Sequence, residues 1–364
     1  MPEPTVLLEE VSPNGNITAV VEQDDRVAYF YLWPSKETGL KVRSCWIRNL
    51  LPAPDEADVI AMRDGRAPLM PRVHCAQPNG DPPLSQESLR IVWSEEGDAA
   101  ALYADNEMLA VIPSWSGSNG FHGYSLACVG NGPVAWEIGT PESNVLFERF
   151  REAAKYRASW DDKELWPKYS DQMLRSLESV LGRHSKYFAI DGGAWPPKAL
   201  VQFNCPTQTV LVTIGMSLRP QPAVENAVTE PKDMRRIELA VCLPASTSQE
   251  TVNAVAQYIS GQSGFPWHAY TWLGSGHTMP ADVFVQLSAN RFGFALLTNQ
   301  MPELPSLHLR TFRGDPVSIL WFLPISESER TFAMNNGSQS LLRRLAEAGV
   351  SGKALFARQP LQML

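Results

Sequence analysis

Two histidines lie in an aromatic, glycine-rich segment, Gly264 to Pro280, which reads GFPWHAYTWLGSGHTMP. Imidazole can act as a general base near neutral pH or as a metal ligand. A hydrolase that uses His277 with Asp282 or with a distant carboxylate, or a metal held by His268 and His277, is therefore one hypothesis for this segment. Together with the neighbouring aromatic residues the histidines form a candidate surface for partner binding, which comprises Trp267, His268, Tyr270, Trp272 and His277.

A structural role for the same segment explains its composition better. Gly274 and Gly276 would permit positive φ angles in a tight turn, and His277 would hydrogen-bond main chain there. The indole and phenol rings would fill a core while their polar ends reach backbone groups. No nucleophile accompanies the histidines, and Asp282 is the nearby acid. We therefore predict no catalytic residue.

Templates for cofactor and metal chemistry are absent from the sequence. It has no GxGxxG after a strand, no P-loop, no GxSxG elbow and no HExxH helix. The five cysteines are widely scattered without a CxxC pair, which argues against a zinc site of usual spacing and against a disulfide framework. We expect no cofactor and no metal.

Composition and charge narrow the class of protein. The 364 residues are 44% hydrophobic and 19% charged, as in a globular protein of two domains. Residues 1–141 carry 9 basic and 19 acidic side chains, so this half is strongly acidic and unsuited to a nucleic-acid backbone. No run is long and apolar enough to cross a membrane, and the acidic N-terminus MPEPTVLLEE does not fit a secretory signal. We expect a cytoplasmic protein.

Short strand-like runs separated by turn residues fill the first half, which predicts a mostly β domain over residues 1–140. The clearest hairpin joins 99–104 to 108–112 through Asp105-Asn106. The other expected strands are 17–22, 26–33, 40–47, 89–93, 124–129 and 134–138.

Helical signals begin at Thr140-Pro141, so a second domain is expected over residues 141–364. We predict helices from Thr140, from about Ser170 to Gly182, after the capping boxes Thr247-x-x-Glu250 and Ser326-x-x-Glu329, and from about Ser338 to Gly349. Strands are predicted at 199–203, 209–218, 236–243, 282–287, 292–297, 307–312 and 317–325. The domain should be α+β, with a mixed or antiparallel sheet covered by helices.

Four stretches of this domain, in order, resemble the Suppressor of Fused family: TIGMSLRPQP, RIELAVCLP, YTWLGSGHTMP and VSILWFLPISESERTFAMNNGSQSLLRRL. The resemblance covers about residues 160–364. Animal members of the family bind Hedgehog-pathway transcription factors by gripping an extended peptide between two lobes. Their second lobe follows this domain, whereas here an unrelated domain precedes it, so the resemblance does not carry that ligand over.

Bacterial members of the family are thought to be immunity proteins that neutralise toxins. The resemblance therefore implies a protein that binds another protein, such as a toxin domain, without enzymatic activity. The candidate contact surface is the segment from Trp267 to His277, together with the cleft expected between the two domains. A third hypothesis, a scaffold subunit, would require a constitutive oligomer with a large apolar contact.

Overall fold

The computed structural model describes residues 4–289, 291–299, 307, 309–350 and 355–363. Contacts divide the chain into two compact units. The first unit contains Met1–Asp161 and the short segments Glu225–Ala227 and His268–Tyr270, and the second contains Asp162–Val224, Val228–Trp267 and Thr271–Leu364. Among the described residues, no helix combines the length and the hydropathy needed to cross a membrane.

The division after Asp161 lies beyond the boundary expected near residue 140. Helix α2 (Leu146–Ala158) accounts for the difference, because it buries Leu146 and Phe150 in a core cluster of the first unit. The helix also begins later than expected. Thr140 does not cap it; its N–H bonds Ser143 Oγ at 2.9 Å, within a turn that precedes the helix.

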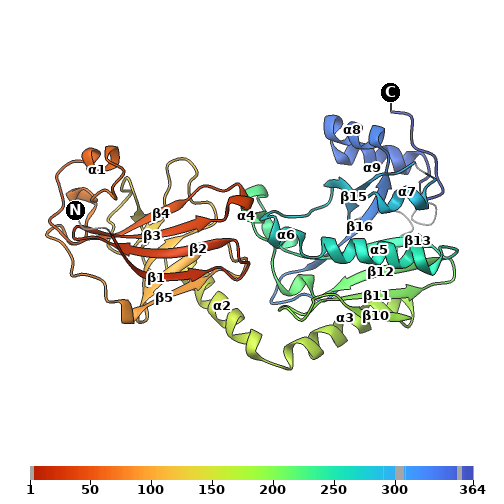
Figure 1. Cartoon of the computed structure of the whole chain (residues 1–364), viewed down its shortest axis with the longest axis horizontal. Helices are drawn as coiled ribbons and strands as arrows, with labels where there is room; N and C mark the ends of the chain where they lie inside the picture. Colours follow the sequence, from red (N-terminus) through yellow and green to blue (C-terminus); the bar gives the residue numbers. More distant parts are fainter. Residues whose placement is uncertain (1–3, 290, 300–306, 308, 351–354, 364) are drawn as a thin grey trace. The chain divides into compact units, whose positions relative to one another are not determined.

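Two β-sheets form the body of the first unit (Figure 1). One sheet has the order β1-β2-β3-β4 and the other the order β5-β6-β7-β8-β9. They face each other through contacts of β3 and β4 with β7 and of β1 with β5. The first sheet comprises β1 (Thr5–Val11), β2 (Ile17–Gln23), β3 (Val27–Pro34) and β4 (Arg43–Asn49); the second comprises β5 (Leu89–Trp93), β6 (Ala100–Ala104), β7 (Glu107–Ile112), β8 (Tyr124–Ser125) and β9 (Trp136–Glu137).

Most of the expected strands of this unit are present. The β6–β7 hairpin is confirmed, with Asp105 at a φ of 52° in its two-residue turn. Strand β1 was not among the predictions, and the runs 124–129 and 134–138 contribute only two-residue strands. A short helix, α1 (Val59–Arg63), interrupts the proline-rich connection between the two sheets.

One sheet with helices on both faces makes the second unit α+β, as predicted (Figure 1). Its order is β10-β11-β12-β13-β16-β15-β14, and every neighbouring pair is antiparallel except β13 and β16. The strands are β10 (Lys186–Ala189), β11 (Ala199–Asn204), β12 (Gln208–Ile214), β13 (Arg236–Pro244), β14 (Thr278–Pro280), β15 (Phe294–Thr298) and β16 (Val317–Ile325).

Apolar side chains from the helices form a core on each face of this sheet. Helix α3 packs one face through residues such as Met173 and Leu177. Helices α5, α7, α8 and α9 pack the other face, with Ile259 and Phe284 among the buried residues. The helices are α3 (Leu165–Leu181), α4 (Val224–Ala227), α5 (Gln249–Gln262), α6 (Phe265–His268), α7 (Val283–Leu287), α8 (Glu327–Asn336) and α9 (Ser338–Glu347).

Two expected strands of the second unit are wrong. The run 282–287 instead holds helix α7 (Val283–Leu287), because the short apolar run turns to bury Phe284 against the sheet. Of the expected strand 307–312, position 308 lies outside the described residues and 309–312 hold only an isolated bridge between Phe312 and Asp315.

Two helices of this unit begin at residues that differ from the predicted ones. Helix α3 begins at Leu165, ahead of the expected Ser170, and Gly182 caps its C-terminal end as predicted. Ser248 caps α5 by accepting from Thr251 N, so the expected cap at Thr247 is one residue early. The capping box of Ser326 and Glu329 is confirmed.

Candidate functional site

A pocket of about 690 Å³ lies in the second unit beside the segment that the sequence singled out. Helix α5 supplies Tyr258 to its wall and α6 supplies Phe265. The loop after α6 and strand β14 supply Trp272, His277 and Met279, and the start of α7 supplies Asp282 and Val283. The volume is within the range of pockets that receive small ligands.

Backbone bonds hold the turn that presents these side chains. His277 N bonds Gly274 O at 3.1 Å, and Gly276 N and His277 O pair with Leu297 at 2.8 Å each. Gly276 has a φ of 101°, which confirms the expected need for glycine there. Gly274 is required for another reason, because a Cβ atom at this position would lie 2.3 Å from the ring of Trp272.

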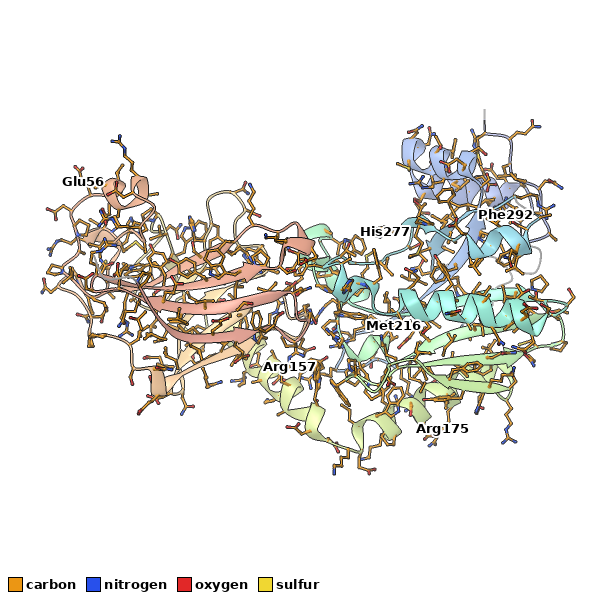
Figure 2. All side chains as sticks on the ribbon, in the orientation of Figure 1. Glu56, Arg157, Arg175, Met216, His277 and Phe292 are labelled. Atoms are coloured by element: carbon orange, nitrogen blue, oxygen red, sulfur yellow. The ribbon has the colours of Figure 1, made fainter. Side chains whose placement is uncertain are left out.

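Trp272 and His277 form one aromatic unit in the pocket wall. Their ring centroids lie 4.4 Å apart, with the planes at 61°. Burial lowers the pKa of His277, and a hydrogen bond with the backbone of Trp272 opposes this effect only in part. His277 (Figure 2) is therefore a neutral, half-buried ring at neutral pH, which suits an apolar contact.

Trp267 does not face this pocket. Its side chain is buried in the core of the second unit, and its indole Nε1 donates to Pro220 O at 2.8 Å. Its ring lies under the guanidinium of Arg219, 5.1 Å from the centroid, and borders a separate cavity of about 120 Å³ with Lys198. The polar end of this indole reaches a backbone group, as predicted for the tryptophans of the segment.

His268 and Tyr270 group with the first unit and not with the pocket. His268 is exposed at the end of α6. Tyr270 is buried, has a φ of 48°, and its pKa is raised by burial. The structure therefore brings together only Trp272 and His277 of the five candidate residues.

The enzymatic alternative paired His277 with Asp282 or with a second histidine. Both His277 and Asp282 line the pocket. The ring of His277 packs against the ring of Trp272, however. Burial raises the pKa of Tyr258, and the negative charge of Asp282 raises it further. Among the described residues, no group of three or more His, Cys, Asp or Glu side chains is placed to hold a metal ion.

The stretches that carry the family resemblance contact one another behind the pocket. Gln221, from TIGMSLRPQP, is buried and clamps Leu273 of YTWLGSGHTMP. Its amide accepts from Leu273 N and donates to Leu273 O, both at 2.9 Å. Thr271 N bonds Pro266 O at 2.9 Å. These bonds fix the backbone that carries Trp272, so this ring has a defined position in the pocket wall.

Sequence reasoning missed the opposite wall of the pocket. Tyr258 lies on the same helix as the predicted inward residues, and nothing in its local pattern marks it as a pocket residue. Its hydroxyl donates to Pro280 O at 2.6 Å and ties α5 to strand β14. Phe265 stood within the segment that was singled out, and its 39% exposure on a four-residue helix is a property only of the folded chain.

Comparisons with known proteins address the second unit. Residues 199–355 match the family model described as Suppressor of fused protein (SUFU). A SUFU homologue from Neisseria gonorrhoeae FA 1090 aligns with 54% of this chain and 99% of its own, at 18% identity and a TM-score of 0.38. The structure of a Sufu–Fu complex aligns with 53% of this chain and 98% of its own, at 13% identity and a TM-score of 0.34.

A search of the curated proteins gave no significant match. The family model thus covers most of the stretch for which the resemblance was expected and omits its first part, helix α3 and strand β10. All four sequence stretches that suggested the family lie within the matched residues. Residues 199–355 of this chain therefore match the Suppressor of fused family model, as the sequence resemblance predicted.

Proposed function

We propose that the protein binds another protein without enzymatic activity, and that the 690 Å³ pocket receives an apolar or aromatic side chain of the partner. The pocket carries this proposal. Tyr258, Phe265, Trp272 and Met279 give it an aromatic and apolar lining, with neutral His277 beside them. Anchor side chains that fill such pockets contribute most of the affinity at protein interfaces.

Side-chain anchoring fits this site better than addition of a strand. Strand β14 is at the edge of the sheet and pairs only with β15 in the described chain. It is three residues long and ends in Pro280, whose carbonyl accepts from the Tyr258 hydroxyl. Short, proline-containing edge strands resist further pairing. The partner should therefore engage the pocket through its side chains.

The match of residues 199–355 to the Suppressor of fused family model supports a protein partner. Our finer proposal is a bacterial immunity protein whose partner is a toxin domain, acting in the cytoplasm. The five cysteines are unpaired, and four of them are buried, which suits a reducing compartment.

Binding can be tested with two truncating variants of the pocket and one matched control. Phe265→Ala and Met279→Ala remove pocket surface, whereas Met334→Ala removes an exposed apolar side chain on α8. The full chain is used to capture proteins from its native cells at near-physiological salt, and the affinity of a captured partner is measured by calorimetry. We expect Phe265→Ala to weaken binding about ten- to thirtyfold, as for an interface anchor, and Met334→Ala to have no effect.

Equal affinity of all three variants for the same partner would place the interface elsewhere. The toxin proposal has its own test, in which cells that express the captured partner grow only when the wild-type chain is co-expressed. If the partner is harmless to those cells, the immunity role is wrong while protein binding stands. His277→Gln addresses the enzyme: loss of a measured hydrolytic activity with unchanged partner affinity would favour catalysis over our proposal.

A further inference from the structure

The first unit presents an open face on its β1–β4 sheet, and this face does not form part of the site proposed above. The alternation of side chains assigns the residues of each strand to one face or the other. Ala19, Val21, Phe30 and Leu32 turn inward and are fully buried. In the view of Figure 1 no helix lies across the front of β1, β2 and β3. Of the outward side chains of these strands, Val20 and Tyr29 are buried, while Val6, Val11 and Trp33 are exposed and available to a partner.

Strand register places the outward residues in three rows across the sheet. Val6, Glu22 and Tyr29 form the first row; Glu9, Val20 and Tyr31 form the second; Val11, Thr18 and Trp33 form the third. Val6, Val11 and Trp33 are 47%, 56% and 45% exposed. Exposed apolar groups gathered on one face indicate an interaction surface more often than scattered ones do.

Aromatic rings run along β3 through the middle of this face. The Tyr29 and Tyr31 centroids are 5.8 Å apart in a stacked arrangement, and those of Tyr31 and Trp33 are 6.0 Å apart. Tyr29 is itself buried, with its hydroxyl on Pro68 O at 2.8 Å, so Tyr31 and Trp33 are the rings that a ligand can reach. Aromatic faces attract cations through the ring quadrupole.

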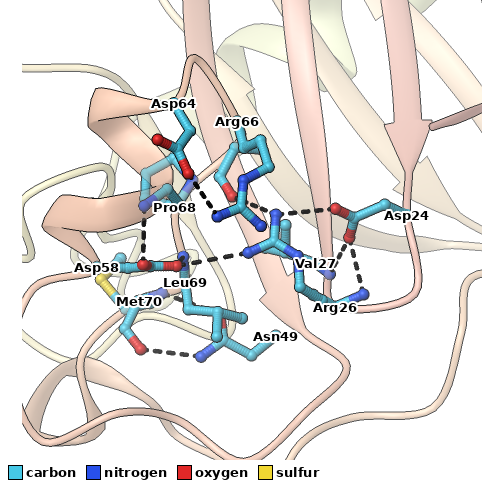
Figure 3. Close-up of polar contacts among 12 residues, drawn as sticks. Asp24, Arg26, Val27, Asn49, Asp58, Asp64, Arg66, Pro68, Leu69 and Met70 are labelled. Atoms are coloured by element: carbon cyan, nitrogen blue, oxygen red, sulfur yellow. Dashed lines mark hydrogen bonds and ion pairs between the residues drawn. The ribbon is translucent and has the colours of Figure 1, made fainter. Parts of the chain in front are cut away.

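A pocket of about 380 Å³ adjoins the aromatic row at the Tyr29 end, and Tyr31, Glu22 and Asp25 contribute to its lining. Its two arginines already have carboxylate partners (Figure 3). Arg26 pairs with Asp24 at 3.0 Å and with Asp58 at 3.5 Å, and Arg66 pairs with Asp64 at 3.0 Å.

Carboxylates therefore exceed guanidinium groups at this end of the face. Glu22 and Asp25 add negative charge beyond the three acids that pair with the arginines, and Glu9 stands in the adjacent row. The pKa of Tyr31 is raised to about 12, first by burial and then by the charges of Glu22 and Asp24. A ligand that carries positive charge is favoured at such a surface.

We propose that the open face of β1–β3 binds a positively charged segment of a partner protein, with Lys or Arg side chains near Glu22 and over the rings of Tyr31 and Trp33, and apolar side chains against Val6 and Val11. The carboxylates provide ion pairs and Tyr31 and Trp33 provide cation–π contacts. The negative charge of the face favours a basic peptide over an acidic one. The exposed valines favour a peptide over a free metal cation or a polyamine, because neither of these needs an apolar contact.

The test uses the purified full chain and a fluorescein-labelled octapeptide of alternating Lys and Val, with a Glu-Val octapeptide as its counterpart. Fluorescence anisotropy should show binding of the Lys-Val peptide with a dissociation constant below about 1 mM, a weak specific interaction. Trp33→Ala and Glu22→Gln should each weaken it about three- to fivefold, the size of one cation–π contact or one exposed ion pair. The Glu-Val peptide should not bind, and raised salt should release the Lys-Val peptide.

Two variants control for the loss of any exposed apolar or acidic side chain: Val145→Ala, at a site 80% exposed, and Glu87→Gln, also exposed. Both should bind like the wild type. Equal binding of the two peptides, no binding at all, or equal weakening by the control variants would overturn the proposal. So would sedimentation that shows a dimer dissociated by Trp33→Ala, because the face would then be a contact between copies of this chain. An oligosaccharide that perturbs the Trp33 indole resonance when the peptide does not would overturn it too.

Discussion

Replacement of Glu238 by alanine should unfold the second unit at much lower urea concentration. This carboxylate is completely buried on β13 and accepts four hydrogen bonds. Gly215 N, Ser217 N and Ser217 Oγ donate to Oε1 at 2.9, 3.1 and 2.6 Å, and Thr213 Oγ1 donates to Oε2 at 2.7 Å. Through these bonds Glu238 closes the turn after β12, where Gly215 has a φ of 106°.

The size of the effect follows from the donors that alanine would leave behind. The two hydroxyls can turn to other acceptors, since Ser217 Oγ also contacts Tyr169 and Thr213 Oγ1 lies 3.4 Å from Leu239 O. The two backbone N–H groups cannot turn. Each buried donor without an acceptor costs about 1–3 kcal/mol, so the two N–H groups should lower the free energy of unfolding by about 2–6 kcal/mol. That is a large share of the roughly 5–15 kcal/mol that stabilises an ordinary domain.

Urea denaturation of the full chain measures this loss, and hydrogen exchange of the segment 213–221 reports it locally. Glu238→Gln retains one oxygen for the two N–H groups and should cost less than about 1.5 kcal/mol, as for a single hydrogen bond. Glu347→Ala, an exposed acid, is the matched control. Burial raises the pKa of Glu238 above its ordinary value of 4.5 against the opposing effect of its hydrogen bonds.

A raised pKa in the folded state gives this acid a stabilising contribution that is complete below pH 4.5 and is lost as pH rises through the folded pKa. The Gln variant, which cannot ionise, should lack this loss. Equal urea midpoints for Glu238→Ala and Glu347→Ala would refute this prediction. So would amides of Gly215 and Ser217 that keep their protection from hydrogen exchange in Glu238→Ala.

Three further substitutions test other parts of the second unit. Arg358→Met should lower the free energy of unfolding, measured in urea, by about 3–5 kcal/mol. The fully buried carboxylate of Glu329 would lose the guanidinium that lies 2.6 Å from it. Gly274→Ala should cost about 1–3 kcal/mol and weaken partner binding in calorimetry, since the new Cβ displaces the Trp272 ring. Neutral His277 contributes stability above the ordinary pKa of 6.5 that is lost as pH falls through its lowered folded pKa. The stability advantage of wild type over His277→Gln should therefore shrink as pH falls below 6.5.

Local patterns predicted those elements whose stability depends on nearby residues. The capping box of Ser326 and Glu329 and the inward face of α5 with Val252 and Ile259 follow from contacts within a few turns. The hairpin at Asp105 depends on a two-residue turn. Such features need no knowledge of the rest of the chain.

Elements that depend on distant partners were not accessible in this way. The run 282–287 alternates too briefly to separate a strand from a helix, and the position of Phe284 over the sheet decides the outcome. Strands β13 and β16 pair in parallel across about eighty residues, with Leu239 opposite Leu320. No local pattern gives that register.

The candidate site shows the same limit. Sequence directed attention to the segment around Trp272 and His277, but the pocket also needs Tyr258 from α5 and Val283 from α7. Trp267 has the same residue type as Trp272 and a similar setting, yet it faces the core. Which aromatic ring meets solvent is decided by the packing of helices that the segment does not contain.

The open face of the first unit could be predicted from the sequence in larger part. Tyr29, Tyr31 and Trp33 alternate in one predicted strand, and a period of two puts all three rings on one face. What the pattern leaves undetermined is which face is buried. Phe30 and Leu32 are apolar as well, and only the second sheet, packed on their side, leaves Tyr31 and Trp33 outside.

Stability and binding are divided between different residues of the same segment. Gly274, Gly276 and the clamp on Leu273 by Gln221 hold the backbone, so changes there should damage the fold first. Phe265 is 39% exposed and lies outside those bonds. Its removal should therefore leave the urea midpoint close to that of the wild type while it weakens partner binding. A variant that lost both together would show that the pocket wall and the turn are one structural unit, and that binding cannot be retuned there without loss of the fold.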